Sequence, residues 1–312
     1  MRIASIDIGT NTVLLLIADV DEDGTIHPVA HEQRLPRLGK DVDLRRMISI
    51  GAFDKIAWII NEYKNLAKQH KAEHIVAAAT SAVRDAANRE EFCSYIRSST
   101  GIGIEVLPGE EEALWTYYGA LSGFPASGKE SVVLDIGGGS TEISLRTPGS
   151  RNGGKNILRY SLQVGSVRIT ERYLKHSPPP PDEVESARQM ILEELAPVRN
   201  PGFRDYRLIG VAGTVTTLAC LDQNLEEFDV EKVSGYTLSI QTVRAWSQRL
   251  NSMDTGSIAG LSSTTAGRAD ILAAGVLILS EIMIHFGFES VIASERGLRY
   301  GLVVRQWQRT RT

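Results

Sequence analysis

The chain alternates between short apolar runs of strand length and longer segments in which apolar residues recur at helical spacing. Apolar runs at 3–6 and 13–18 flank a polar turn and predict two strands. The segment 52–70 places an apolar side chain every three to four residues, which predicts a helix. Further strands are predicted at 74–79, 104–107, 131–135, 142–146, 157–163, 207–211 and 290–293, and further helices at 89–98, 110–121, 182–198, 240–251, 266–286 and from about 296. Strands that alternate with helices indicate an α/β architecture.

The strand–turn–strand pattern of the N-terminus returns in the second half of the chain, which indicates two domains. A length of 312 residues agrees with two domains of ordinary size. The stretch 122–130 is small, polar and rich in Gly and Pro, so we place the boundary there. The predicted domains are 1–122 and 123–312, and packing of the last helix back across the cleft between them is left open.

Composition narrows the class of protein. Charged residues make up 23% of the chain, but the net charge is −4, so a nucleic-acid partner is not predicted. Two distant cysteines, Cys93 and Cys220, do not form a disulfide framework and agree with a cytoplasmic location. The apolar run 271–286 is shorter than a membrane span needs, so it is predicted to be a buried core helix and no membrane partner is expected.

Two related turns carry the clearest chemical signal. The segments "IDIGTNT" (6–12) and "LDIGGGST" (134–141) each place Asp-Ile-Gly after an apolar strand and a hydroxyl three residues after the glycine. A Gly-rich turn directs several backbone N–H groups into one concavity that binds phosphate oxygens. An acid directly before such a turn repels phosphate unless a cation lies between them, and Mg²⁺ takes carboxylate and phosphate oxygens. Ordinary β-turns are the alternative, which the duplication makes less favoured.

The hydroxyls of these turns are further candidate donors to phosphate: Thr10, Thr12, Ser140 and Thr141. A third candidate is the segment "GVAGTVTTLA" (210–219), where Gly213 and Thr214 follow a strand and open a helix whose N-terminus favours anions. The alternative there is a helix N-cap at Thr214. The stretch "GFPASGKES" (123–131) looks like a P-loop, but Glu130 replaces the required hydroxyl and a strand follows instead of a helix, so we reject it.

An acidic first turn and an arginine complete the candidate chemistry. Glu110, Glu111 and Glu112 cannot all face one way, because successive residues of a helix are rotated by about 100°. Helix geometry does not say which of them faces a site. Arg84 follows a buried strand and is suited to bidentate phosphate binding, and a surface ion pair with Asp85 or a nearby Glu is equally open.

For two other sets of charged residues, a structural role is the favoured interpretation. Arg34, Arg37 and Lys40 form a local basic patch that could follow a polyanion, although a solvated surface is favoured. Arg268 and Asp270 begin the most apolar helix, and a structural ion pair is the favoured interpretation.

These motifs, taken together, resemble those of the exopolyphosphatase/guanosine pentaphosphate phosphatase (Ppx/GppA) family of the sugar kinase–Hsp70–actin superfamily. The resemblance follows the family's order over essentially the whole chain. It rests on "IDIGTNT" (6–12), "RLG" (37–39), "TSAVRDA" (80–86), "GEEEA" (109–113), "LDIGGGSTE" (134–142), "VGSVR" (164–168), "GVAGTVTTLA" (210–219), "GRADILAAG" (267–275) and "SERGLRYGL" (294–302).

The resemblance implies two ribonuclease H-like α/β domains with the active site in the cleft between them. It implies hydrolysis of a terminal phosphoanhydride, with Mg²⁺ or another divalent cation, in inorganic polyphosphate or guanosine pentaphosphate. By motif, Glu112 is the implied catalytic base, Asp135 and Glu142 are metal or water partners, Asp7 lies opposite them, and Arg84 faces the phosphate. The implied phosphate-binding residues are Gly9, Thr10, Asn11, Gly137, Gly138, Gly139, Ser140 and Thr141.

Three expectations remain open at this point. The chain lacks the helical C-terminal domains of longer family members, which favours short over long polyphosphates. We also expect a homodimer. The rival functions are an ATP-dependent phosphotransferase of the same superfamily and a non-catalytic sensor of nucleotides or alarmones.

Overall fold

The computed structural model describes residues 1–124, 130–146, 157–200, 202 and 206–311, and the chain forms two compact units. Unit 1 comprises Met1–Pro125 and Arg296–Thr312, and unit 2 comprises Ala126–Glu295. The division falls within the predicted linker, whereas the last helix belongs to unit 1 although the sequence analysis assigned it to the second domain. The centre of the P-loop lookalike lies outside the described residues. The Gly-rich stretch 148–154, for which the sequence predicts a hairpin tip, also lies outside them.

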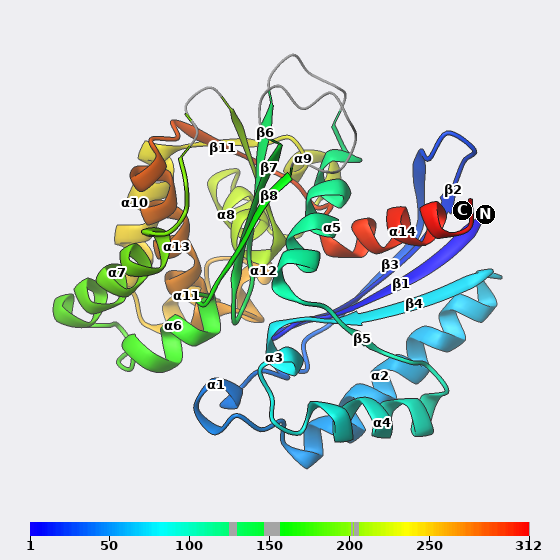
Figure 1. Cartoon of the computed structure of the whole chain (residues 1–312). Helices are drawn as coiled ribbons and strands as arrows, with labels where there is room; N and C mark the ends of the chain where they lie inside the picture. Colours follow the sequence, from blue (N-terminus) through cyan, green and yellow to red (C-terminus); the bar gives the residue numbers. More distant parts are fainter. Residues whose placement is uncertain (125–129, 147–156, 201, 203–205, 312) are drawn as a thin grey trace. The chain divides into compact units, whose positions relative to one another are not determined.

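Unit 1 is built on a five-stranded mixed sheet with the order β3-β2-β1-β4-β5 (Figure 1). Its strands are β1 (Arg2–Ile8), β2 (Val13–Val20), β3 (Ile26–Arg34), β4 (His74–Ala79) and β5 (Glu105–Val106). The first three strands pair antiparallel, and β4 and β5 add in parallel to β1. This is the strand order of a ribonuclease H-like domain, so the predicted fold class is confirmed. The helices are α1 (Val42–Arg45), α2 (Ile50–Gln69), α3 (Ser81–Arg84), α4 (Arg89–Thr100), α5 (Gly109–Leu121) and α14 (Leu298–Arg309).

The alternation of side chains along β1 decides what lies on each face of this sheet. Ala4, Ile6 and Ile8 belong to the core that includes α2 and α4. Ile3 points to the opposite face, where it packs in a core with Tyr300 and Val303 of α14. Asp7 has the same parity as Ile3 and therefore lies on the α14 face. In Figure 1 the red helix α14 accordingly runs beside both α5 and the sheet.

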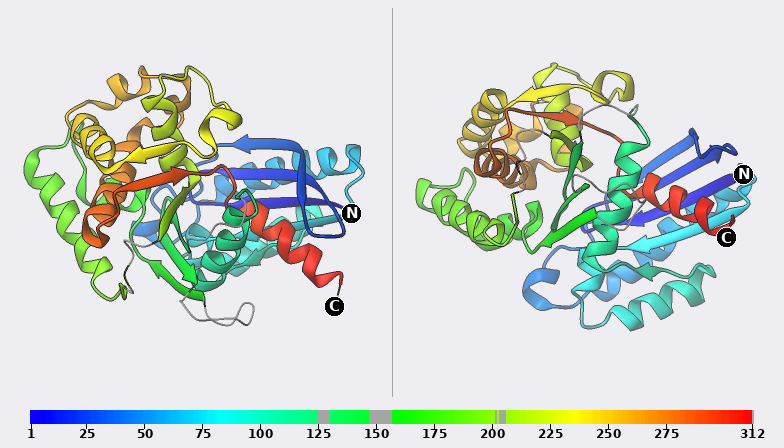
Figure 2. Two further views of the ribbon diagram at one scale, coloured as in Figure 1. Left: turned by 90° about the horizontal axis from the view of Figure 1, so that it is seen from above. Right: turned by 45° about the horizontal axis from the view of Figure 1, so that its top comes forward.

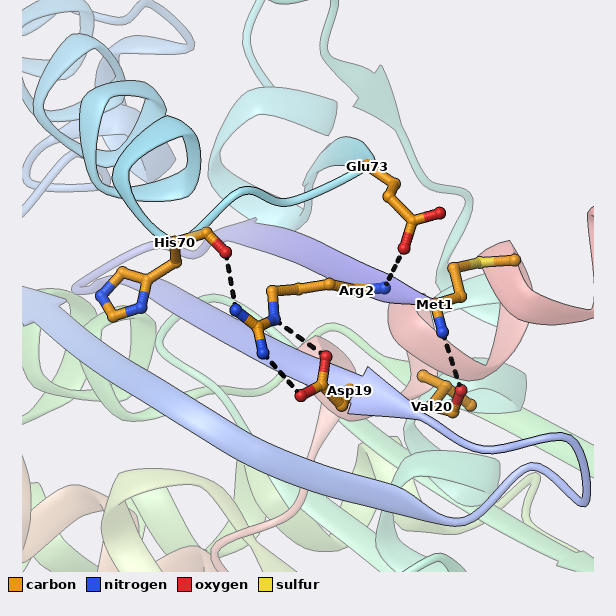
Figure 3. A network of polar contacts seen from close by, with 6 residues as sticks. All are labelled: Met1, Arg2, Asp19, Val20, His70 and Glu73. Carbon is orange, nitrogen blue, oxygen red and sulfur yellow. Dashed lines mark hydrogen bonds and ion pairs between the residues drawn. The ribbon is translucent and has the colours of Figure 1, made fainter.

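The first residues of the chain are tied to two neighbouring segments (Figure 3). The Arg2 guanidinium donates to both carboxylate oxygens of Asp19 at 2.8 and 2.7 Å and to the His70 carbonyl at 2.8 Å. The Arg2 backbone N–H donates to Glu73 Oε1 at 2.8 Å. These bonds join β1 to the end of β2 and to the α2–β4 connection, which supports the register of the sheet that carries Asp7.

Unit 2 is built on a six-stranded mixed sheet with the order β10-β11-β9-β6-β7-β8, seen from two further sides in Figure 2. Its strands are β6 (Ser131–Ile136), β7 (Thr141–Arg146), β8 (Ile157–Leu162), β9 (Arg207–Val211), β10 (Thr237–Ser239) and β11 (Ser290–Ala293). Strands β6, β7 and β8 form an antiparallel meander, and β9 and β11 extend the sheet in parallel. The helices are α6 (Ser166–Tyr173), α7 (Pro181–Leu195), α8 (Ala212–Asp222), α9 (Val230–Val233), α10 (Ile240–Asn251), α11 (Thr255–Ala259), α12 (Ser263–Ala266) and α13 (Ala269–Phe286).

Helix α13 occupies the core of unit 2. Among the described residues it alone is long and apolar enough to be compared with a membrane span, with a mean hydropathy of 1.8, but 83% of it is buried in the structure. Its side chains pack with strands β6, β7 and β9 and with helices α7, α8 and α10. This agrees with the predicted buried core helix. The predicted helix at 266–286 begins later than expected, at Ala269, because the short helix α12 precedes it.

Candidate functional site

The first glycine turn links β1 to β2 and is held from behind by the "RLG" segment. The Gly9 N–H donates to the Thr12 carbonyl at 2.9 Å and closes the turn. The Thr10 carbonyl accepts from the Gly39 N–H at 2.7 Å, and the Asn11 carbonyl accepts from the Arg37 N–H at 3.1 Å. A Cβ at position 39 would lie 2.1 Å from Thr10 Cγ2, so glycine permits this approach. The "RLG" motif therefore supports the turn through its backbone.

The second glycine turn, residues 137–140, repeats this arrangement in unit 2. The Gly137 N–H donates to the Ser140 carbonyl at 3.0 Å. The carbonyl groups of all three glycines accept hydrogen bonds from the "VGSVR" segment, so these carbonyls point toward that segment. Within the described residues, the N–H groups of Gly138 and Gly139 donate no backbone hydrogen bond. Such N–H groups form the kind of concavity that binds anions.

The predicted side-chain donors of these turns differ in what they contact. Thr141 Oγ1 is fully buried and donates to the Val164 carbonyl at 2.7 Å, so this hydroxyl anchors the turn from inside unit 2. Asn11 Nδ2 is buried and has no hydrogen-bond partner among the described residues. A buried amide donor in that state is available to an oxygen atom of water or of a ligand.

The start of α8 contradicts one of the two interpretations of the "GVAGTVTTLA" segment, and anion binding there stays a prediction. Val211 is the N-cap, so Thr214 lies inside the helix and the alternative of an N-cap at Thr214 is wrong. Thr214 packs against α13, where a Cβ at Gly275 would lie 2.5 Å from Thr214 Oγ1. The Arg268 guanidinium covers Gly213, because a Cβ there would lie 1.3 Å from Nη1. The sequence analysis expected Arg268 to pair with Asp270 and did not predict its contact with Gly213. This contact places a cation at the N-terminus of α8.

Two carboxylates of unit 2 lie next to each other on the sheet. Asp135 on β6 is directly opposite Glu142 on β7, and Glu142 is directly opposite Ser161 on β8. Residues that face each other across antiparallel strands project from the same side of the sheet, with Cβ atoms about 5 Å apart. Glu142 is 2% exposed, and its Oε1 accepts from Ser161 Oγ at 2.7 Å.

The donor chemistry of this pair is of the kind that divalent cations take. No group of three or more His, Cys, Asp or Glu side chains forms a complete metal site among the described residues. Mg²⁺ is commonly bound by one or two carboxylates, with water and phosphate oxygens as its other ligands. Asp135 and Glu142 offer that number of carboxylates on one face. Asp7, the other expected ligand, belongs to unit 1.

The three acids at the start of α5 have three different environments. Glu110 is exposed, and Glu111 accepts from Trp115 Nε1 at 3.0 Å. Glu112 is only 7% exposed, and its Oε2 accepts from Arg84 Nη1 at 2.7 Å. The same Arg84 nitrogen donates to the Leu107 carbonyl at 2.9 Å. The ion pair that was open for Arg84 is therefore a buried one with Glu112, and it holds the acid in one orientation.

Burial is the largest cause of the pKa shifts of two acids in unit 1, Asp7 and Glu112. It raises the pKa of Asp7 to about 7, the charge of Glu112 adds to this shift, and Arg299 opposes it. Burial also raises the pKa of Glu112, against the charge and hydrogen bond of Arg84, while Asp85 raises it further. Asp7 Oδ1 is buried without a hydrogen-bond partner among the described residues. Buried acids with raised pKa values are typical of sites that move protons.

The three residues of the basic patch have different surroundings in the structure. Arg34 donates to Glu32 at 2.8 Å and to Glu62 at 2.5 Å, so its charge is used within unit 1. The side chains of Arg37 and Lys40 are exposed beside the first turn. Arg34 is therefore a half-buried, ion-paired residue and not a solvated one, and for Arg37 and Lys40 the interpretation as a solvated surface stays a prediction.

Several residues that contact the predicted site had no role in the sequence analysis. Arg168 and Arg299 stood inside quoted motifs, and Ser161 did not. The sequence shows these residue types, but the groups that they contact at the site are 19 or more residues away in sequence or on another element. No local spacing reveals such contacts, which depend on strand register and helix placement.

Comparison with known proteins supports the motif-based resemblance. The model of the Ppx/GppA phosphatase family matches residues 16–310. Exopolyphosphatase 2 of Mycobacterium tuberculosis is 33% identical, with 97% of this chain and 98% of that protein covered. The crystal structure of an exopolyphosphatase-like protein is 32% identical, has a TM-score of 0.92, and covers 100% of this chain and 99% of its own. An Aquifex aeolicus member of the Ppx/GppA family is 30% identical, with a TM-score of 0.83 and the same coverage.

Proposed function

Because the chain belongs to the Ppx/GppA phosphatase family, we propose that it hydrolyses the terminal phosphoanhydride of inorganic polyphosphate, of guanosine pentaphosphate, or of both. The observation that carries the proposal is the buried Glu112, which Arg84 orients at 2.7 Å within the family's "GEEEA" motif. The full-length similarity to proteins named exopolyphosphatase favours polyphosphate as the first substrate to test.

In the proposed reaction a water molecule attacks the terminal phosphorus, and the bond from that phosphorus to the bridging oxygen breaks. Glu112 accepts the proton of the attacking water. A base is most effective when its pKa lies near the working pH, and burial moves the pKa of Glu112 in that direction. Arg84 keeps the carboxylate in place as it gains the proton.

Phosphoryl transfer depends mainly on positioning and on neutralisation of charge. Asp135 and Glu142 would hold Mg²⁺ or another divalent cation, which supplies positive charge to the phosphate oxygens when it is bound. The N–H groups of the two glycine turns bind further phosphate oxygens, and Asn11 Nδ2 is an additional donor.

The test is release of inorganic phosphate, with Mg²⁺, from tripolyphosphate, long polyphosphate and guanosine pentaphosphate. We expect release with water as the only acceptor, and about 10²- to 10⁴-fold slower turnover in Glu112→Gln. Glu110→Gln is the matched control, because Glu110 is an exposed acid of the same helical turn and should leave the rate unchanged. Unchanged turnover in Glu112→Gln would refute the assignment of the base.

The same assay separates the rival functions. A phosphotransferase would form ADP from ATP only when an acceptor is added. A sensor would bind nucleotide saturably without turnover. The expected homodimer and cytoplasmic location stay predictions.

A further inference from the structure

The "VGSVR" segment has no role in the proposed reaction, yet it contacts the carbonyl groups of the second glycine turn. Ser166 N–H donates to the Gly137 carbonyl at 2.9 Å, and Val167 N–H donates to the Gly138 carbonyl at 2.8 Å. A Cβ at Gly165 would lie 2.5 Å from the Gly138 oxygen, so the start of α6 touches the turn directly.

Arg168 completes this contact with its side chain. It is a buried arginine, 4% exposed, and its Nε donates to the Gly139 carbonyl at 2.7 Å. Its Nη2 donates to Gln163 Oε1 at 3.1 Å. The guanidinium therefore ties the Gly139 carbonyl to the segment that precedes α6.

The planarity of the peptide bond explains what the three contacts do. In each peptide unit the carbonyl points opposite to the N–H of the next residue. Fixing the carbonyls of Gly137, Gly138 and Gly139 therefore fixes the directions of the N–H groups of Gly138, Gly139 and Ser140. Without these bonds, three consecutive glycines would sample many backbone conformations.

We propose that Arg168 is a positioning residue that presets the second glycine turn for a phosphate oxyanion by holding the Gly139 carbonyl. It acts through the backbone and does not touch the ligand. The inference rests on the proposed function in one respect, namely that the anion is part of an oligophosphate. Its consequence is that anion affinity depends on a side chain on the far side of the turn.

The experiment measures binding of methylenediphosphonate, which is not hydrolysed, by calorimetry with Mg²⁺, together with kcat and KM for tripolyphosphate. We expect Arg168→Ala to bind about 10- to 100-fold more weakly, as loss of a charge-assisted hydrogen bond predicts. Millimolar guanidinium should restore part of that affinity. Gln163→Ala removes an exposed anchor of Arg168 and should weaken binding several-fold without endangering the fold.

Arg188→Ala is the matched control, because it removes another arginine of unit 2 that is bonded to a buried acid, Glu281, at 3.0 Å. It should lower Tm without changing affinity. Unchanged affinity in Arg168→Ala and Gln163→Ala, or no binding by the wild type, would overturn the inference. If Arg168→Ala does not fold, Gln163→Ala decides the question. Arg168-dependent binding without release of phosphate from any of the three substrates would support the inference and contradict the proposed function.

Discussion

At the scale of single residues, two buried acids have pKa values that burial raises. Asp7 and Glu112 both lie in unit 1, both are largely removed from water, and both have a raised pKa. An acid whose pKa is raised in the folded state binds its proton more tightly there than in the unfolded chain. The fold is therefore less stable when such an acid must be charged.

Asp7→Asn should stabilise the protein in a pH-dependent way. The pKa of Asp7 is about 7 in the fold against an ordinary value of 3.8, so its stabilising contribution is complete below pH 4 and is lost as the pH rises through 7. We expect the variant to exceed the wild type by on the order of 1–3 kcal/mol at pH 8 and to match it near pH 4, in urea unfolding with EDTA. Asp19→Asn is the control of opposite sign, because Arg2 lowers the pKa of Asp19. A wild type that gains stability relative to Asp7→Asn between pH 4 and 8 would contradict the shift.

Ser161→Ala should reduce turnover through Glu142. The variant removes the hydroxyl that donates to Glu142 Oε1 at 2.7 Å, so the carboxylate loses a bond that favours its charged form. We expect kcat/KM to fall about tenfold, with a higher Mg²⁺ requirement, and Ser161→Thr to retain most activity. Ser144→Ala is the control, because it removes a buried serine of the neighbouring strand β7. Equal activity in the two alanine variants would show that Glu142 does not need the Ser161 hydroxyl.

At the scale of elements, glycine allows two helices that carry site residues to pack in backbone contact. Helix α5 carries Glu112, and α14 carries Arg299. A Cβ at Gly119 of α5 would lie 2.2 Å from the Gly297 carbonyl oxygen, and one at Gly301 of α14 would lie 1.9 Å from the Trp115 carbonyl oxygen. Both clashes involve backbone, which cannot move aside without separating the helices.

Gly119→Ala should therefore be strongly destabilising. We expect a loss of about 2–4 kcal/mol in the free energy of unfolding, since overpacking against backbone forces the two helices apart. Gly51→Ala is the matched control in α2, where a Cβ meets nothing within 4 Å, and it should be neutral or stabilising by up to about 1 kcal/mol. Chemical denaturation of both variants measures the difference. A Gly119→Ala variant as stable as Gly51→Ala would show that α14 is not packed as described.

The two strands that carry Asp-Ile-Gly differ in the residue that their neighbouring strand places opposite the aspartate. Asp7 and Asp135 stand at equivalent places in their sheets, but the residue opposite Asp7 is Leu14, whereas the residue opposite Asp135 is Glu142. Only unit 2 therefore sets two carboxylates side by side at this position. The repeated turns are alike in their backbone bonds and unlike in the acids beside them.

At the scale of the whole molecule, the first unit is assembled from both ends of the chain. Residues 296–312 return to it after the 170 residues of unit 2. Tyr300 and Val303 of α14 close a core with Ile3 and Leu16, and Trp307 covers Gly24 in the β2–β3 turn. The stability of unit 1 therefore depends on the C-terminal helix.

Truncation after Glu295 should unfold unit 1 while unit 2 keeps its own core. Removing α14 exposes the apolar residues of one sheet face, and each large buried side chain contributes about 1.5–3 kcal/mol. We expect calorimetry to lose the transition of unit 1 and limited proteolysis to cut within residues 1–125. Truncation after Arg309 is the control and should behave as the full chain. A truncated protein with an unchanged melting profile would contradict the assignment of α14 to unit 1.

Much of the architecture and part of the site follow from the sequence. The alternation of apolar residues predicts the strands, and the helical repeats predict α2 and α13, because side-chain periodicity reflects local backbone geometry. Asp-Ile-Gly with a following hydroxyl predicts both turns, since only glycine suits the tight backbone approach. These features depend on residues that are close in sequence, so they can be predicted without the tertiary structure.

Tertiary structure decided the contacts between distant segments. Helix geometry left three adjacent acids equivalent, and the fold buries Glu112 among them and pairs it with Arg84 of α3. The fold also placed α14 on unit 1, Arg268 over Gly213, and Arg168 behind the glycine turn. A helical repeat shows that one face of a helix is apolar and does not show which sheet will cover it. Likewise, an arginine in a motif does not name its acceptor, because the partner is set by the packing of the whole domain.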